Sequence, residues 1–205
     1  MSSRRMRGFS LIEMIIVITV LLIACAVSFM TLQPALKQGH VTSAYNFTLG
    51  ALRKAREDAV GDRRVYMVTF TTSLATNVPS TITITQSDTG VVTTTYQLPT
   101  DVKFQTQTGF PVSQTTPPTT PDGFGLGVVP IDFDQGVSGG VTTAIYFYPD
   151  GSAQDVNNNI NNGVIYMGRT GDLYSSRAIT VWGATGRLRG WRLYQNGASN
   201  YWRQM

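Results

Sequence analysis

The chain has 205 residues and a formal charge of +4, from 16 Lys and Arg against 12 Asp and Glu. Removing residues 1–8 takes three arginines away and leaves 13 basic residues (16 minus 3) against 12 acidic ones, so the composition does not indicate a general affinity for nucleic acid. A single cysteine excludes an intrachain disulfide, and the length suits one apolar segment and one compact domain.

The first predicted element is an apolar helix over residues 9–32. Its core, Leu11–Leu32, holds 22 residues with one charge. At about 1.5 Å per residue this helix is ~33 Å long, which is enough to cross a bilayer core. The arginines ahead of it favour a cytoplasmic N-terminus and an extracytoplasmic domain. Cys25 lies inside the run, where it is most simply a small apolar residue.

The residues before the apolar run carry a second signal. A secretory signal peptide would place small residues at a cleavage site after its apolar core, but the small residue here, Gly8, precedes the core. Gly8-Phe9-Ser10-Leu11-Ile12-Glu13 resembles the type IV prepilin motif of bacterial inner-membrane proteins. The resemblance implies that residues 1–8 are a leader, that prepilin peptidase cuts between Gly8 and Phe9, and that the new amino group of Phe9 is methylated.

Glu13 is an acid inside a membrane-spanning pattern, where a charge costs a few kcal/mol, so a partner or a function is expected for it. Cleavage would create a partner, because the α-amino group of Phe9 on a neighbouring subunit is a cation. In a bundle of such helices this charge pair would neutralise both groups and set the axial register. The alternative is that Glu13 simply reaches the cytoplasmic interface.

Residues 33–62 are predicted to be an amphipathic extension of the same helix. Pro34 and Gly39 are expected to kink or loosen the helix between residues 33 and 40. Beyond them, apolar and small residues recur at helical spacing: Val41, Ala44, Tyr45, Thr48, Leu52, Ala55 and Ala59. This face is expected to dock on the globular domain, and Gly61 is expected to end the helix.

Residues 63–205 are predicted to form an extracytoplasmic β-domain. Alternating patterns between turn residues predict strands at Val65–Phe70, Thr81–Thr85, Val91–Leu98, Val102–Phe104, Ala144–Tyr148, Val164–Met167, Ala178–Trp182 and Arg187–Tyr194. A stretch rich in Thr, Pro and Gly at about 105–140 is predicted to be a long surface insertion. The fold class is therefore α+β, with a long N-terminal helix packed on a mainly antiparallel β-domain.

Two further segments, Ile145–Ala153 and Ile179–Gly190, resemble the β-domain of the FimT/GspH group of minor pilins and pseudopilins. In that group a Pro-Asp-Gly hairpin precedes a terminal strand that begins with Gly-Arg-x-Arg. The resemblance implies a pilin-like fold. The insertion and the tail after Tyr194 have no counterpart in it.

Catalytic and metal-binding patterns find little support, and no cofactor is expected. The only histidine, His40, lies beside the membrane exit, away from any nucleophile. Asp132 and Asp134 could form a carboxylate pair on a strand, but a solvated edge is the better interpretation. Residues 155–163 have the Asp and Asn spacing of a calcium loop without its Gly and Glu, so an Asn-rich turn is expected.

The C-terminal segment from Gly186 to Met205 is basic and aromatic and holds no acid. On a strand, Arg187, Arg189 and Trp191 share one side, which would offer phosphate contacts beside a stacking surface, and Arg192 adds a further charge. In the FimT-like branch the Gly-Arg-x-Arg motif is associated with DNA binding during transformation. The alternative is that these arginines decorate a solvated strand or pair with acidic residues.

The sequence therefore predicts a structural protein rather than an enzyme: a minor type IV pilin or pseudopilin subunit. Its expected partners are other pilin subunits, prepilin peptidase and the inner membrane, and its final location is a pilus or a type II secretion pseudopilus. One alternative is a DNA-binding minor pilin that acts through Arg187 and Arg189. Another is a single-span anchored domain outside any filament.

Overall fold

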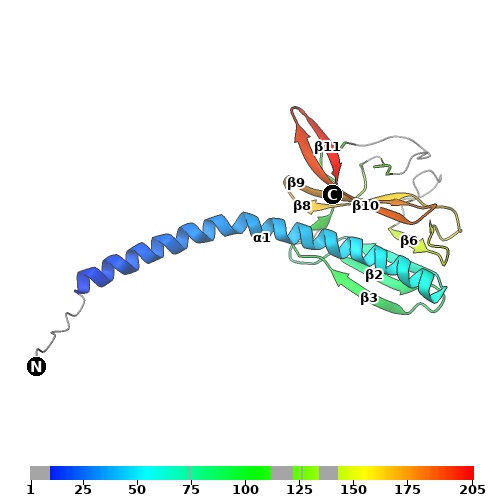
Figure 1. Ribbon diagram of the computed structural model, residues 1–205, viewed down its shortest axis with the longest axis horizontal. Coiled ribbons are helices and arrows are strands. Elements are labelled where there is room, and N and C mark those ends of the chain that lie inside the picture. The colour runs from blue at the N-terminus through cyan, green and yellow to red at the C-terminus, as the bar shows by residue number, and fades with distance from the viewer. Residues whose placement is uncertain (1–9, 74, 112–121, 126, 134–142) are drawn as a thin grey trace, which may run out of the picture. The chain divides into compact units, whose positions relative to one another are not determined.

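A computed structural model describes residues 10–73, 75–111, 122–125, 127–133 and 143–205. Its elements follow the chain in the order α1 (Leu11–Asp62), β1 (Tyr66–Thr71), β2 (Thr81–Gln86), β3 (Val92–Gln97), β4 (Lys103–Phe104), β5 (Ile131–Asp132), β6 (Ala144–Phe147), β7 (Ala153–Gln154), β8 (Gly163–Arg169), β9 (Asp172–Trp182), β10 (Arg187–Asn196) and β11 (Ser199–Gln204) (Figure 1). The chain divides into two compact units, Met1–Gly39 and His40–Met205.

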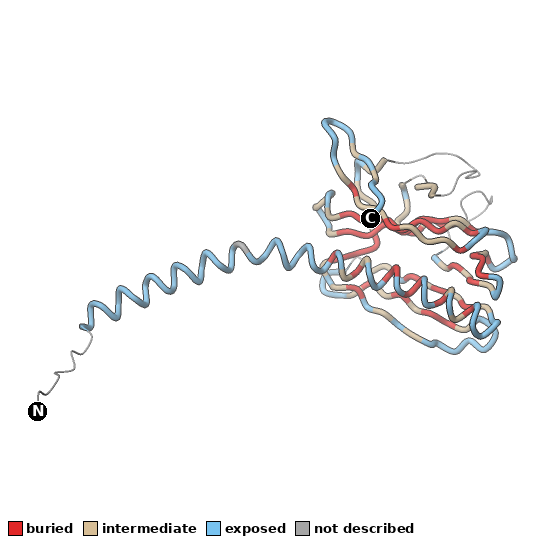
Figure 2. Tube along the Cα trace, viewed as in Figure 1, coloured by how far each residue is buried: buried red, intermediate tan, exposed pale blue. Residues whose placement is uncertain are grey.

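The described helix of the first unit presents apolar side chains on all sides. Leu11, Phe29 and Leu36 are 78%, 71% and 54% exposed, and the described residues of this segment are drawn as exposed in Figure 2. Its most apolar stretch is entirely unburied. Within the described residues, α1 is the one helix that is long and apolar enough to cross a membrane, judged by length and composition.

Helix α1 is continuous through Pro34 and Gly39, so residues 33–40 do not break it, and the predicted kink or loosening there stays a prediction. A proline costs about 3 kcal/mol in a helix interior and a glycine about 1, so the helix carries a local cost at these two positions. The helix also passes Gly61 and ends at Asp62, where Arg63 takes the left-handed conformation with φ of 55°.

The helical spacing from Val41 onward produced the predicted buried stripe. The side chains of Val41, Ala44, Thr48, Leu52, Ala55 and Ala59 are at most 1% exposed, and Tyr45 packs at their margin. The small alanines let the helix axis approach the sheets closely. This second part of α1 lies along the sheets in Figure 1 and contributes to a single main core with them.

The strands form two antiparallel sheets. The first sheet has the order β3-β2-β1-β6-β7, and the second has the order β11-β10-β9-β8-β4, with β5 also paired to β8. The expected α+β architecture is confirmed, and each predicted strand corresponds to an observed one. Strands β5, β7 and β11 and the first half of β9 were missed.

The two faces of the second sheet have different surroundings. Its inner face carries Ile165, Ile179 and Val181 into the main core with α1. Its outer face carries Tyr166 and Ala178 into a smaller cluster, against which Phe110, Phe124, Trp191 and Trp202 also pack. The alternation of side chains along β8, β9 and β10 therefore sends neighbouring residues into separate environments.

The segment at 105–140 is only partly the surface insertion that was predicted. Ile131 and Phe133 are 2% and 1% exposed and belong to the main core. Phe110 and Phe124 cover the outer face of the second sheet. The Thr, Pro and Gly content concealed these buried residues because they follow no regular period.

Candidate functional site

The N-terminal motif is described only from Ser10 onward, so Gly8 and Phe9 lie outside the described residues. Met14 N donates to the Ser10 carbonyl at 3.1 Å, and Glu13 stands in the first turn of α1. An acid in a first turn is favoured by the helix dipole by about 0.3–1 kcal/mol. No cation of the described residues lies within 4 Å of its carboxylate. Glu13 thus remains available to a partner outside this part of the chain.

The arginines of the Gly-Arg-x-Arg motif lie on the outer face of the second sheet and share one carboxylate. Arg187 Nη2 and Arg189 Nη1 donate to Asp122 Oδ2 at 3.1 and 2.7 Å. Thr180, the cross-strand neighbour of Arg189, donates from Oγ1 to Asp122 Oδ1 at 3.0 Å. The Asp122 side chain is only 12% exposed. A residue of the insertion therefore neutralises part of the charge proposed for DNA.

Trp191 also lies on this outer face, but its ring is already in contact. Its Nε1 donates to Thr180 Oγ1 at 2.9 Å, and its ring meets Phe124 edge to face at 5.2 Å. Phe124 in turn stacks on Trp202 at 5.6 Å. These contacts hold the partly exposed indole in place and reduce the surface that it could offer for stacking.

Arg192 is separated from the other three residues, because it lies on the inner face of the sheet. Its cross-strand neighbours are Arg177 on β9 and Arg203 on β11. Its guanidinium carbon lies 5.2 Å from the centre of the Tyr194 ring. The four residues predicted to act together thus belong to two surfaces of opposite orientation.

The glycine of the motif has a structural explanation. Gly186 has φ of 60°, and a Cβ there would lie 2.1 Å from the Gly151 carbonyl oxygen. Arg56 of α1 donates from Nε to Gly151 O and from Nη2 to Thr185 O, both at 3.1 Å. These bonds join the Pro-Asp-Gly turn between β6 and β7 to the turn between β9 and β10.

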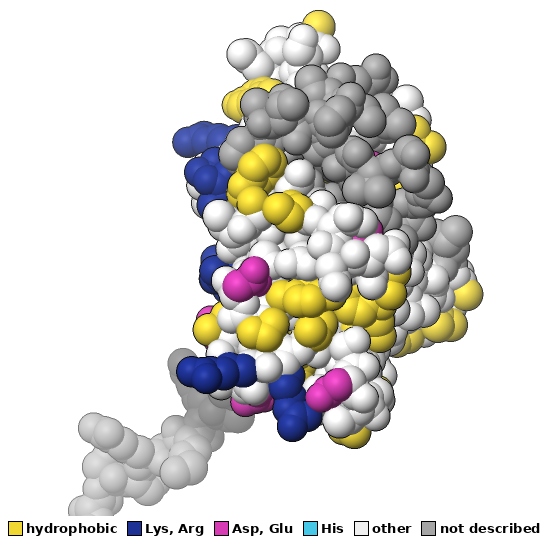
Figure 3. All heavy atoms as spheres, turned by 90° about the vertical axis from the view of Figure 1, so that its right-hand side faces the viewer, with side chains coloured by type: hydrophobic (Ala, Val, Ile, Leu, Met, Phe, Trp, Pro, Cys, Tyr) yellow, Lys and Arg dark blue, Asp and Glu magenta, His cyan; other side chains and the backbone are white. Residues whose placement is uncertain are grey.

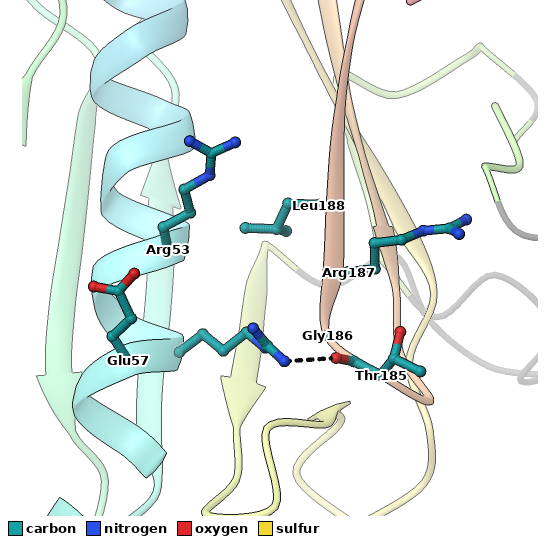
Figure 4. Close-up of a pocket in the computed structure, with 7 residues that line it drawn as sticks. Arg53, Glu57, Thr185, Gly186, Arg187 and Leu188 are labelled. Atoms are coloured by element: carbon teal, nitrogen blue, oxygen red, sulfur yellow. Dashed lines mark hydrogen bonds between the residues drawn. The ribbon is translucent and has the colours of Figure 1, made fainter. Parts of the chain in front are cut away.

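A cavity of about 430 Å³ lies beside these bonds, between α1 and the start of β10. It is lined by Arg53, Arg56, Glu57, Thr185, Gly186, Arg187 and Leu188. Figure 4 shows Leu188 directed towards α1 and the Arg187 side chain directed away from it. The alternation along β10 thus removes the Arg187 charge from this cavity and places it beside Asp122.

The polar groups weighed for catalysis or metal binding have structural partners. His40 Nδ1 lies 2.9 Å from Asp101 Oδ1. Asp155 Oδ1 accepts the backbone N–H groups of Asn157 and Asn159, each at 2.8 Å, which is the expected Asn-rich turn. Asp134 lies outside the described residues. In the part of the chain that the structure describes, no three His, Cys, Asp or Glu side chains are grouped to hold a metal.

Sequence reasoning missed Asp122, which pairs with the two motif arginines, and Phe124, which packs on Trp191. Asp122 stands 65 residues before Arg187, inside a segment without periodicity. The missed strand β11 had a signal, because the two-residue turn between β10 and β11 is Gly197-Ala198, and glycine with positive φ at the first position is typical of hairpin turns.

Comparison with known proteins gives one match to a family and one to a solved structure. Residues 3–29 match the family described as the prokaryotic N-terminal methylation motif. The crystal structure of the type IV minor pilin FimU from Pseudomonas aeruginosa is similar with a TM-score of 0.43 and 11% identity, over 83% of this chain and 96% of that chain. No curated protein sequence matches the chain. The chain therefore carries, at residues 3–29, an N-terminal methylation motif of the type IV prepilin kind.

Proposed function

We propose that the chain is a minor type IV pilin or pseudopilin subunit with a structural rather than a catalytic role. The observation that carries this proposal is the methylation motif at residues 3–29, placed on a helix whose apolar side chains are left exposed. Such a helix needs lipid or other helices around it, because water would solvate it poorly. The β-domain joined to it would lie on the extracytoplasmic side, next to neighbouring subunits.

The assembly step rests on Glu13 and on the amino group that cleavage would create at Phe9. Two opposite charges that meet between helices neutralise each other and fix how far one helix slides past the next. The described residues supply no cation for Glu13, which agrees with a partner on another subunit.

Processing is the first experiment. Co-expression with prepilin peptidase is expected to remove residues 1–8, leaving 197 residues (205 minus 8), and mass spectrometry should find one added methyl group on Phe9. Gly8→Val, which places a bulky side chain at the cleavage site, is expected to stay uncleaved. An intact Gly8–Phe9 bond in the wild-type protein under these conditions would favour the single-span anchored domain instead.

The pilus and the pseudopilus differ in what the filament does rather than in how it is built. Loss of surface pili after deletion of the gene would assign the chain to a type IV pilus. Loss of secreted enzymes from the medium with pili intact would assign it to type II secretion. Neighbouring genes for a retraction motor or for an outer-membrane secretin would point the same way.

A DNA-binding minor pilin is the second candidate function. Arg187 and Arg189 lie side by side on the outer face, with side chains 39% and 35% exposed, so phosphate could reach them in part. Asp122 opposes this role, because its carboxylate already accepts from both groups. DNA would have to displace or outweigh that carboxylate.

Removing the Asp122 charge should therefore strengthen any DNA binding. In a gel-retardation assay at low salt, Asp122→Asn is expected to bind duplex DNA several-fold more tightly than wild type. The reason is that the Asp122 carboxylate occupies both arginines and so weakens the free energy of DNA binding by about 1–2 kcal/mol. The double change Arg187→Ala with Arg189→Ala should abolish the binding. The control is Arg63→Gln with Arg64→Gln, which removes the same charge at the end of α1. Absence of retardation for wild type and Asp122→Asn would reject this function.

A further inference from the structure

Three arginines stand in a row across the inner face of the second sheet. Arg192 on β10 pairs in register with Arg177 on β9 and with Arg203 on β11. We call these three residues the arginine row. Like charges at directly opposite positions of neighbouring strands destabilise a sheet, so the row carries a cost that the fold itself does not explain.

The charge of the arginine row is not balanced by the described residues. No described carboxylate lies within 4 Å of any of its guanidinium groups. Arg177 is 3% exposed and donates only to the backbone carbonyls of Ser175 and Ser176, at 3.0 and 3.1 Å. Its burial, together with the charge of Arg192, lowers the pKa of Arg177 to about 10. The Nε of Arg192 is buried with no hydrogen-bond partner.

Tyrosine rings surround the arginine row. Arg203 lies 5.7 Å from the centre of the Tyr194 ring, on which Arg192 also rests, and Tyr194 stacks on Tyr201 at 6.0 Å. A cavity of about 200 Å³ opens beside Arg192 and is lined by Tyr174, Leu193, Tyr194 and Gln195 as well. Tyr174 and Tyr201 are 42% and 41% exposed. The surface therefore combines cations with amphipathic rings, as membrane interfaces do.

The arginine row lies near the point where α1 enters the domain. The charge of Arg177 acts on Tyr45 of α1. Asp101, bound to His40, also accepts from Arg169 Nε at 3.2 Å, beside the start of β9. His40 follows the last residue of the predicted span, Leu32, by eight positions, or about 12 Å of helix. A headgroup layer begins within that length of chain.

The face at the other end of the domain has a different charge pattern. In Figure 3, the view onto the end of α1 shows both basic and acidic side chains on the described surface. Arg64 pairs there with Asp88 at 2.8 Å, and Lys54 pairs with Asp58 at 2.9 Å. Both of these basic residues therefore have a carboxylate partner, which the arginine row lacks among the described residues.

We propose that the arginine row binds the phosphate groups of anionic phospholipid headgroups in the membrane that α1 enters. Guanidinium groups match phosphate oxygens in a bidentate geometry, and the exposed tyrosines would lie at the same depth. Binding would supply the negative charge that the sheet lacks. The site is independent of the Gly-Arg-x-Arg cluster on the outer face and of whether a filament forms.

The test uses the full chain in neutral detergent micelles, titrated with a short-chain phosphatidylglycerol or with a phosphatidylcholine of the same chain length. Phosphatidylglycerol is expected to bind more tightly. Arg192→Gln with Arg203→Gln should weaken it about thirtyfold, since each basic residue near an anionic surface contributes about fivefold. Phosphatidylcholine binding should stay unchanged. The matched control, Arg53→Gln with Arg63→Gln, removes two exposed charges elsewhere and should bind as wild type does.

Arg177 is left unchanged in this test because it is buried, and its substitution is expected to destabilise the fold. Circular dichroism of each variant checks that the fold is retained. Equal affinity for the two lipids, or an unchanged affinity in the Arg192 and Arg203 variant, overturns the proposal. If inorganic phosphate binds as tightly as phosphatidylglycerol, the arginine row is a site for a free anion and not for a lipid headgroup. Duplex DNA bound through these arginines without a lipid preference would reassign it to nucleic acid.

Discussion

Replacing Glu13 by leucine is expected to leave the protein in the membrane and to remove it from filaments. The substitution deletes a charge that opposes insertion, so extraction with alkaline carbonate should still find the protein in the membrane fraction. In an assembled bundle it would leave the amino group of Phe9 unpaired, at a cost of about 3–5 kcal/mol. The amount recovered in sheared filaments should therefore fall at least about tenfold.

The matched control for this experiment is Glu57→Leu. Glu57 is an exposed acid on the same helix, and no ion pair to a described residue involves it. This variant should enter filaments as wild type does. Normal incorporation of Glu13→Leu would remove the register argument and leave Glu13 only its favourable position in the first turn of α1.

The second large effect is expected at Gly186, the glycine of the Gly-Arg-x-Arg motif. Gly186→Ala would place a Cβ 2.1 Å from the Gly151 carbonyl oxygen and 2.8 Å from Arg56 Nε, at a backbone φ of 60°. The left-handed conformation costs an alanine about 1 kcal/mol, and the clash with a backbone atom adds about 1–3. The free energy of unfolding should therefore fall by about 2–4 kcal/mol, as measured by urea denaturation of the full chain in micelles.

Gly197→Ala separates the two contributions. Gly197 has the same φ of 60°, but no atom lies within 4 Å of a Cβ built there. Its substitution should cost only the conformational part, about 1 kcal/mol. If both variants lose the same free energy of unfolding, the close approach of Gly151 to Gly186 does not contribute to the destabilisation caused by Gly186→Ala. The motif glycine would then need a functional explanation.

The Asp122 contacts change how the Gly-Arg-x-Arg motif should be viewed in this chain. A basic motif in a sequence shows where positive charge is placed, but the partner of that charge depends on the fold. Here Asp122 lies in a segment that the sequence predicted to be a surface insertion, and the fold brings it beside Arg187 and Arg189. Among the described arginines of the second sheet, those without a carboxylate within 4 Å are instead Arg177, Arg192 and Arg203, on the opposite face.

Regular periodicity explains which parts of the fold could be predicted. The stripe from Val41 to Ala59 recurs every three or four residues, so its burial follows from helix geometry alone. Alternation predicted the strands of both sheets in the same way. Strands β5 and β7 are two residues long, which is too short for a period to be visible.

Local chemistry determined the N-terminal part of this protein. The arginines at positions 4, 5 and 7, Gly8, Phe9, Glu13 and the apolar run follow one another closely in the chain, so they can be interpreted without distant residues, and the match over residues 3–29 agrees with that interpretation. The tertiary structure alone decided the state of the C-terminal arginines, because a carboxylate 65 residues before Arg187 pairs with two of them and strand register joins the other three in a row. Charge compensation acts through space, and an irregular segment carries no period from which its position could be derived.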